Sequence, residues 1–248
     1  MQAYIGGVLP LSTDHWINNI CTVVSFSGCD FRCPYCDTPD LLEARQETLT
    51  NLKDVQRTIQ ENAAVINGVF LTGGEPCLQR QALVELCVFA KRKNLKVGID
   101  TNGSKPEVLA SILKQGLADY ICLDAKAPIE EEIFNRVTCA GTFFKTSGSV
   151  AQDFARTLGL IRKYQDNVLL DVKTTVVPGL MYKKEDVLQI AEKVSALSCT
   201  WILKAFSSNK KVLNQKYQNI NSPSQSFLDN LKGNCLRRYP DLPVRIEM

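Results

Sequence analysis

The chain alternates between short apolar runs and longer segments in which apolar residues recur every three or four positions. The short runs have the length and composition of buried strands, and the longer segments have the periodicity of amphipathic helices. Thr50 and Ser104 precede two of these helices and are expected to cap them. The expected strands cover residues 20–27, 68–72, 96–100, 120–124, 168–177, 200–206 and 244–246. The expected helices cover residues 51–65, 79–93, 150–164, 184–197 and 224–238, together with a short helix after Ser104.

Six strand–helix units in succession predict an α/β fold with a parallel sheet and right-handed crossovers. The architecture that fits this order is a partial (β/α)6 TIM-like barrel with parallel strands. We expect a single domain over residues 1–248, with a core at about 18–206 and a C-terminal extension at 207–248. The part from 207 to 226 is rich in Asn, Ser, Lys and Gln, so we expect it to be mobile.

Composition narrows the class of protein. The chain has 248 residues, of which 45% are hydrophobic and 22% charged, and a net charge of +3, so one domain can bury a core. Its ten cysteines follow no disulfide framework, which favours a reducing, cytoplasmic location. We see no export signal and no apolar run of membrane-spanning length. Basic residues are dispersed without interleaved aromatics, so we expect no nucleic-acid partner. We expect a monomer.

Polar motifs follow the predicted strands directly. Because the carboxyl ends of parallel strands meet at one face of a barrel, where active sites form, these motifs are expected to lie together. They are the stretches 29–36, 73–75, 100–102, 124–126 and 178–179.

The first of these motifs contains Cys29, Cys33 and Cys36 in a C-x3-C-x2-C spacing. Three thiolates on one short loop can bind three corners of a 4Fe-4S cluster and leave its fourth iron without a protein ligand. An electron carrier normally closes the cluster with a fourth cysteine, so the open iron indicates a site for a cofactor or substrate.

A structural zinc site is the alternative, and it needs a fourth ligand. Cys21 and His15 are the nearby candidates. A strand between Cys21 and Cys29 would separate them by roughly 25 Å at about 3.3 Å per residue. His15 is the only histidine, and a lone histidine is more often structural than a ligand. The spacing therefore favours a cluster over zinc.

The cysteine loop, with Tyr35 before its last cysteine, is followed one strand–helix unit later by Gly73-Gly74-Glu75-Pro76. This combination resembles the radical S-adenosylmethionine (SAM) superfamily. The resemblance implies a 4Fe-4S cluster that reductively cleaves SAM to a 5′-deoxyadenosyl radical. It also implies that Gly73 and Gly74 admit the methionyl end, Glu75 pairs with its ammonium group and Tyr35 lies beside the adenine. The alternative for Gly73 to Pro76 is an ordinary turn.

Further motifs between about residues 5 and 206 lie at 6–12, 28–39, 71–79, 100–103, 123–128 and 173–179. Together they resemble the activating enzymes of glycyl-radical proteins, particularly the anaerobic ribonucleoside-triphosphate reductase activating type. This resemblance implies a glycyl-radical protein as substrate and a flavodoxin or ferredoxin as electron donor. It implies a cation site formed by Asp100, Thr101, the Cys122 carbonyl and Asp124. It also implies that Lys126 contacts SAM and that Lys173 replaces a usual arginine, with the loss of bidentate geometry. The cofactor-binding residues expected from these motifs are Tyr35, Gly73, Gly74, Glu75, Asp100, Asn102, Asp124, Lys126, Lys173 and Val177.

Two stretches depart from that type. Asp37-Thr38 stands where the activating enzymes usually have His-Asn, and it resembles 7-carboxy-7-deazaguanine synthase, in which the threonine helps bind magnesium. Asp37 and Thr38 are therefore either cation ligands or a surface or capping pair. Residues 13–18 replace a turn that is common among the activating enzymes. The alternatives for function are a small-molecule radical enzyme like the synthase and an iron-sulfur module without catalysis.

The remaining candidates are weaker. The basic run 91–93 at a helix end favours the helix dipole, with docking of an acidic electron donor as the alternative. Cys77 follows the Gly-Gly turn and could face the site, although a packed thiol is more common. Cys87 and Cys139 are expected to be core or loop residues.

Overall fold

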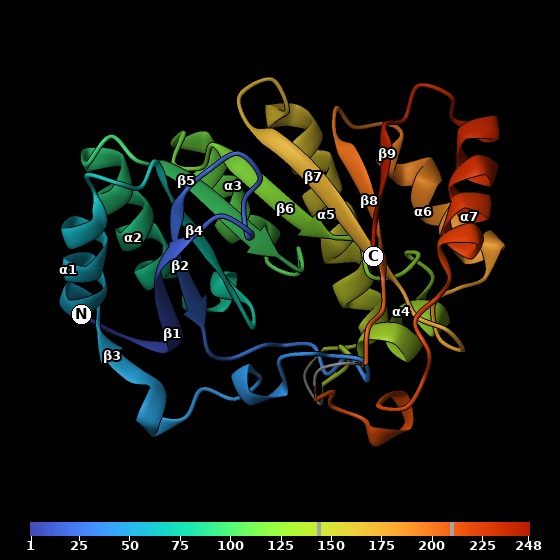
Figure 1. Ribbon diagram of the computed structural model, residues 1–248, viewed down its shortest axis with the longest axis horizontal. Helices are drawn as coiled ribbons and strands as arrows, with labels where there is room; N and C mark the ends of the chain where they lie inside the picture. The colour runs from blue at the N-terminus through green and yellow to red at the C-terminus, as the bar shows by residue number, and fades with distance from the viewer. Residues whose placement is uncertain (143–144, 209–210) are drawn as a thin grey trace.

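The computed structural model describes residues 1–142, 145–208 and 211–248. Within them, one sheet of nine strands has the order β3-β1-β2-β4-β5-β6-β7-β8-β9 (Figure 1). The strands are β1 (Gln2–Ser12), β2 (Cys21–Phe26), β3 (Leu49–Asn51), β4 (Gly68–Gly73), β5 (Lys96–Thr101), β6 (Tyr120–Asp124), β7 (Leu169–Val176), β8 (Thr200–Ala205) and β9 (Val244–Glu247).

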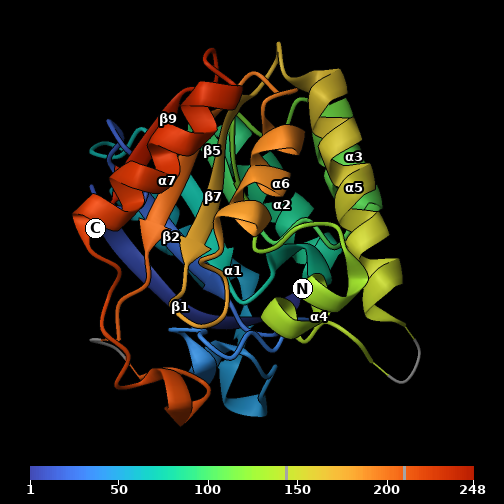
Figure 2. The ribbon, with the colours of Figure 1, turned by 90° about the vertical axis from the view of Figure 1, so that its right-hand side faces the viewer.

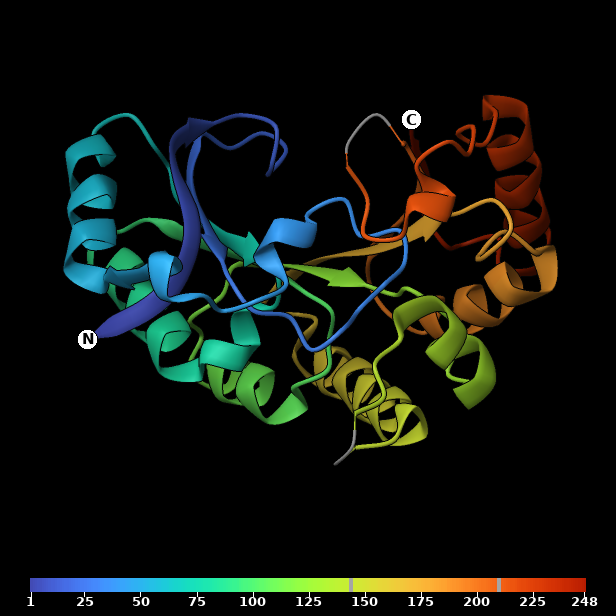
Figure 3. The same ribbon diagram turned by 90° about the horizontal axis from the view of Figure 1, so that it is seen from below.

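Helices form an arc outside the curved sheet, as Figure 3 shows. They cover its outer face (Figure 2), and a helix precedes each parallel strand except β2, which follows β1 directly. The helices are α1 (Leu52–Asn62), α2 (Arg80–Arg92), α3 (Pro106–Lys114), α4 (Glu131–Thr138), α5 (Ser147–Tyr164), α6 (Lys184–Val194) and α7 (Gln225–Arg238). Short 3-10 turns occupy Pro39–Leu41, Gln46–Thr48, Pro76–Gln79 and Gln215–Tyr217.

The six predicted core strands are confirmed as parallel neighbours from β2 to β8, and β9 extends the parallel set next to β8. The fold is a partial TIM-like barrel, because β3 and β9 end the sheet without pairing to each other. Side chains of these strands alternate between the helical layer and the barrel interior. In β4, for example, Leu71 packs in the main core with the helices, whereas Phe70 belongs to a separate interior cluster.

Two of the predicted helix caps are wrong. Thr50 lies in β3, and Asn51 caps α1 by accepting a hydrogen bond from the Lys53 N–H at 3.1 Å. Ser104 does not cap α3, which begins at Pro106, because its hydroxyl donates to Asp30 at 2.7 Å. A tertiary hydrogen bond has thus replaced the local one that the sequence favours.

Several elements were missed by periodicity. β1 runs antiparallel to β2 and β3 and contains two glycines and a proline that weaken its strand pattern. β3 and α4 are short, which leaves little periodic signal. Within the described ranges, none of the helices has the length and apolarity needed to cross a bilayer.

Candidate active site

A cavity of about 520 Å³ opens at the carboxyl ends of the parallel strands. Its lining combines residues from the cysteine loop with residues from the ends of β4, β5, β6, β7 and β8. The barrel therefore brings most of the predicted site residues together, as parallel strand ends should. Those that line the cavity are Cys29, Cys33, Tyr35, Cys36, Thr38, Gly73, Gly74, Asp100, Asn102, Asp124, Lys126 and Lys173.

The cysteine loop is held by backbone hydrogen bonds on both sides. The Gly28 N–H donates to the Leu41 carbonyl at 2.8 Å, and the Glu75 N–H donates to the Gly28 carbonyl at 2.8 Å. Burial raises the pKa of Cys29 to about 12, and it raises the pKa of Cys33 as well. Metal binding at these thiols therefore requires that their protons be released, which iron coordination can drive.

Gly73 and Gly74 lie where no larger residue fits. Gly73 has φ +118°, and a Cβ there would overlap the Phe26 carbonyl oxygen. A Cβ on Gly74 would overlap the Gly28 carbonyl oxygen. The motif is therefore a point of close backbone approach between two loops, and its contact with a cofactor stays a prediction.

The cavity wall contains polar atoms that lack partners. Among the described residues, Tyr35 Oη and Asp100 Oδ1 are buried and make no hydrogen bond. Both residues line the cavity beside the cysteines. Buried polar groups are nearly always satisfied, so these two atoms fit a polar ligand such as the predicted cofactor.

Lysine and aspartate side chains from neighbouring strand ends line the cavity together. Lys126 Nζ lies 2.6 Å from Asp124 Oδ2, whereas no ion pair or hydrogen bond joins Lys173 to another described residue. The charge of Asp100 raises the pKa of Lys173, so this lysine stays protonated. Burial would raise the pKa of Asp124, but Lys126 and Lys173 outweigh it and hold that pKa below its usual range. The cavity thus keeps a free ammonium group for an anionic ligand.

Glu75 does not line the cavity. It is fully buried, and its carboxylate accepts hydrogen bonds from the Cys77 N–H, the Thr101 hydroxyl and the Asn102 N–H at 2.9, 2.8 and 2.7 Å. Burial raises the pKa of Glu75 to about 7, while these three donors favour the anion. The structure therefore gives Glu75 a loop-positioning role, and its predicted pairing with a cofactor ammonium stays a prediction.

Asn102 is held by two loops at once. Its side-chain amide donates to Asp30 Oδ1 at 2.9 Å, and its N–H donates to Glu75. Asp30 also accepts from Ser104 and from Lys105, at 2.7 and 2.8 Å. Burial would raise the pKa of Asp30, but these hydrogen bonds hold it below its usual value. The predicted cofactor residue Asn102 thus links the cysteine loop to the end of β5.

The predicted cation ligands lie on neighbouring strand ends, because Asp100 pairs in register with Cys122 across β5 and β6, and both Asp100 and Asp124 line the cavity. A cation bound there stays a prediction. Thr101 donates to Glu75, and Asp124 is engaged by Lys126. The interior cluster beneath the site contains Cys122. Val177, a predicted cofactor residue, is fully buried, and its N–H donates to the Met181 carbonyl at 2.8 Å. In the described part of the chain, no three His, Cys, Asp or Glu side chains are arranged for a single metal ion.

Asp37 and Thr38 are exposed residues of the cavity wall. Thr38 occupies the cap position of the turn Pro39–Leu41 without making a side-chain cap, so the capping alternative is wrong for this residue. Its hydroxyl lies 3.8 Å from Cys36 Sγ, which places it beside the predicted cluster.

The C-terminal extension covers the cysteine loop. We expected residues 207–226 to be mobile, and this is wrong for the part that bonds to the loop. The Leu213 N–H donates to the Cys36 carbonyl at 3.0 Å, and the Asn214 N–H donates to the Pro34 carbonyl at 2.9 Å. Val212 and Tyr217 are buried in the main core. We call residues 211–217 the strap (Figure 1).

The zinc alternative loses its fourth ligand. Cys21 is fully buried in the interior cluster, and its thiol contacts the Ser12 carbonyl. His15 lines the cavity, but its loop lies at the amino ends of the parallel strands, whereas the three loop cysteines lie at the carboxyl ends.

The other weak candidates lie apart from the cavity. The run 91–93 ends α2, at the opposite end of the strands from the cysteines, and Lys91 pairs with Asp119 at 2.6 Å. Cys77 and Cys87 are buried in the core, and Cys139 ends α4 as an exposed residue.

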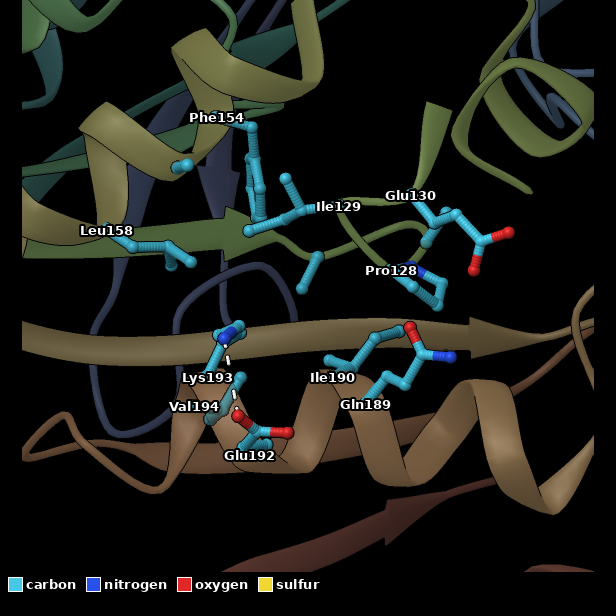
Figure 4. Close-up of a pocket in the computed structure, with 13 residues that line it drawn as sticks. Pro128, Ile129, Glu130, Phe154, Leu158, Gln189, Ile190, Glu192, Lys193 and Val194 are labelled. Carbon is cyan, nitrogen blue, oxygen red and sulfur yellow. Dashed lines mark hydrogen bonds and ion pairs between the residues drawn. The ribbon is translucent and has the colours of Figure 1, made fainter. Parts of the chain in front are cut away.

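A second cavity, of about 560 Å³, lies between α5 and α6 (Figure 4). Apolar side chains such as Phe154, Leu158 and Ile190 dominate its wall, and its lining includes no cysteine. It belongs to the helical layer and is separate from the predicted chemistry.

Sequence reasoning missed several residues of the cavity wall. Thr175 and Lys204 line it, and each follows the inward alternation of its strand. That alternation from Lys173 could have identified Thr175. His15 had no such signal, because its loop precedes β2 at the other end of the strands.

Comparisons with known proteins agree with this geometry. A family model described as the Radical SAM superfamily matches residues 23–194. A protein of Methanocaldococcus jannaschii, whose name assigns it to the glycyl-radical enzyme activating enzymes, is 27% identical over 97% of this chain and 95% of its own. A 7-carboxy-7-deazaguanine synthase of Methanopyrus kandleri is 31% identical over 42% of this chain and 48% of its own. A radical SAM methyltransferase structure from Sphaerobacter thermophilus superposes with TM-score 0.70, at 12% identity, over 96% of this chain and 68% of its own.

The buried position of Glu75 predicts a stability defect for Glu75→Gln. Glutamine keeps the size but turns one acceptor oxygen into a donor that faces an N–H group. We expect the free energy of unfolding to fall by about 1–3 kcal/mol, as measured by anaerobic urea unfolding. The control Glu61→Gln changes an exposed residue of α1 and should have no effect. Equal stability of the two variants would contradict the positioning role.

The strap predicts that Leu213→Pro weakens the cysteine loop. Proline lacks the N–H that donates to Cys36, whereas Leu213→Ala keeps it. After anaerobic iron loading, we expect Leu213→Pro to lose iron to a chelator several-fold faster, which is the effect of about 1 kcal/mol from one hydrogen bond. If both variants lose iron equally fast, the backbone contact does not secure the loop.

Proposed function

The chain belongs to the radical SAM superfamily, and we propose that it installs a glycyl radical on a partner protein such as an anaerobic ribonucleotide reductase. The observation that supports this most directly is the meeting of three loop cysteines with the Gly73-Gly74 turn in one cavity. The unpartnered Tyr35 hydroxyl and Asp100 oxygen in that cavity suit a polar cofactor.

When a 4Fe-4S cluster and SAM are bound together, they supply a one-electron reductive cleavage that removes a hydrogen atom from an unreactive C–H bond. In this proposal, Cys29, Cys33 and Cys36 bind three irons and leave the fourth to the cofactor. Lys173 pairs with the cofactor carboxylate, because its ammonium group has no other described partner. The backbone at Gly73 and Gly74 admits the methionyl end.

A protein substrate is favoured by the extent of the resemblance. The archaeal relative named as an activating enzyme aligns along nearly the whole of both chains, whereas the synthase aligns along less than half. Exposed Asp37 and Thr38 in the cavity wall keep it accessible from outside, as a protein loop requires. We propose a flavodoxin or ferredoxin as electron donor and a cytoplasmic, anaerobic setting.

The second candidate is a small-molecule reaction like that of 7-carboxy-7-deazaguanine synthase. Thr38 favours it, because its hydroxyl lies beside Cys36 at the mouth of the cavity, where a magnesium ion would need an oxygen ligand.

The cluster assignment predicts a sharp division among the cysteines. Alanine at Cys29, Cys33 or Cys36 should abolish 4Fe-4S content after anaerobic reconstitution, as measured by iron and sulfide analysis. Cys21→Ala, Cys77→Ala and Cys122→Ala should retain nearly all of it, since none of these thiols lines the cavity. A fourth essential cysteine would close the open iron and contradict the mechanism.

The two candidate functions predict different products. The reduced protein with SAM should generate a glycyl-radical doublet on its partner by electron paramagnetic resonance, with about one 5′-deoxyadenosine per radical, as expected when each cleavage removes one hydrogen atom. The matched assay supplies 6-carboxytetrahydropterin and magnesium instead. If the protein turns over 6-carboxytetrahydropterin and Thr38→Ala abolishes that turnover, the synthase function is correct and the activating function is wrong.

A further inference from the structure

The loop between β1 and β2 turns into the barrel and closes its floor. Trp16, which is 5% exposed, stacks on Tyr120 with ring centroids 5.2 Å apart and an interplanar angle of 13°. It also contacts Phe70, at 6.4 Å between centroids. This is the stretch in which the sequence departs from the activating enzymes, and the structure shows an exposed turn that inserts one side chain, Trp16, into the interior.

Two strands leave room for this indole. A Cβ on Gly68 would lie 2.9 Å from the Trp16 ring, and a Cβ on Gly98 would lie 3.1 Å from it. Gly68 begins β4, and Gly98 lies in β5. β4, β5 and β6 thus all pack against the Trp16 side chain, so the loop has a defined position in the fold.

The loop is also secured at both ends. The Asn19 N–H donates to the Trp16 carbonyl at 3.0 Å, and the Ile20 N–H donates to the Asn67 side chain at 3.0 Å. The Thr22 hydroxyl donates to the Pro10 carbonyl at 2.8 Å and joins the two strands below the loop. His15 is therefore presented by a fixed support.

His15 is exposed and lines the same cavity as the cysteines. Its loop lies at the amino ends of the parallel strands, whereas the cysteines and the Gly-Gly turn lie at the carboxyl ends. A cofactor held at the cysteines would occupy one end of the cavity. His15 then faces the space in which a substrate must lie.

The hydrogen bonds around Ser12 define the free ring nitrogen. Ser12 Oγ accepts from the Asp14 N–H at 3.3 Å and lies 2.7 Å from His15 Nδ1. The hydroxyl can donate to Nδ1 or accept from it, so this contact does not set the tautomer. In either tautomer the contact occupies Nδ1 and leaves Nε2 available for a hydrogen bond to a ligand in the cavity.

We infer that His15 determines substrate specificity through a hydrogen bond between Nε2 and the main chain of the partner segment. This rests on the proposed function, because it takes a polypeptide as substrate. An extended protein segment offers both a carbonyl acceptor and an N–H donor at nearly every residue, so it can bind Nε2 in either tautomer. Trp16 acts as a positioning residue that holds His15 against the cavity.

The first test compares His15→Leu and His15→Gln with Thr13→Ala, an exposed change in the same loop. His15→Leu should raise KM for the partner protein roughly tenfold, as the loss of one hydrogen bond implies. His15→Gln retains a donor and should restore part of the loss. Thr13→Ala should match the wild type. Iron content, SAM binding and 5′-deoxyadenosine formation without partner should be unchanged in all three.

An unchanged KM in His15→Leu would overturn the inference. A loss of SAM affinity in His15→Leu as large as the rise in KM would also overturn it, because His15 would then contact the cofactor. If the wild type generates no radical on any glycyl-radical partner, the proposed function fails, and that result does not depend on His15.

A second test needs no variant, because His15 is the only histidine in the chain. With histidine-labelled, tag-free protein in the oxidised cluster state, the ring resonances should shift when a synthetic peptide of the partner's glycine loop is added. SAM alone should leave them in place. A shift with SAM alone, or with 6-carboxytetrahydropterin and not with the peptide, would overturn the assignment of a peptide ligand.

Discussion

The close backbone approach between the cysteine loop and the Gly-Gly turn is the constraint on which the site depends. The Gly74 N–H donates to the Phe26 carbonyl at 2.9 Å, and the Glu75 N–H donates to the Gly28 carbonyl at 2.8 Å. Side chains at Gly73 or Gly74 would overlap those carbonyls. Because backbone hydrogen bonds are short and directional, the cysteines are placed relative to the turn by the main chain itself.

Two carboxylates, buried Glu75 and half-buried Asp30, extend this contact to a third loop. Glu75 accepts from Thr101 and Asn102, and Asp30 accepts from Asn102, Ser104 and Lys105. Asn102 is the shared member, since its N–H bonds to one carboxylate and its side chain to the other. Removing a partner would leave a buried charge unsatisfied, which costs more than an exposed ion pair contributes. These residues hold the cavity in shape, while Lys173, Asp100 and Tyr35 keep atoms available to a ligand.

Segments outside the repeated strand–helix units border the two ends of the cavity. The strap bonds to the cysteine loop at one end, and the loop containing Trp16 fills the floor at the other. Scaffolds of this kind diversify through such connections, because changes there leave the packed sheet intact. The chemistry of the cysteines and the choice of substrate can therefore be set by different parts of the chain.

The sequence alone determined the strand–helix order, the parallel sheet and the location of the polar motifs at strand ends. These follow from local periodicity and from the geometry of parallel strands, which need no knowledge of distant contacts. The spacing of the cysteines likewise identified their loop as a cluster site. Only the tertiary structure decided that Ser104 bonds to Asp30 instead of capping a helix and that Glu75 faces inward. It also decided that His15 reaches the cavity. In each case contacts with residues far away in the chain outweighed the local preference that the sequence shows.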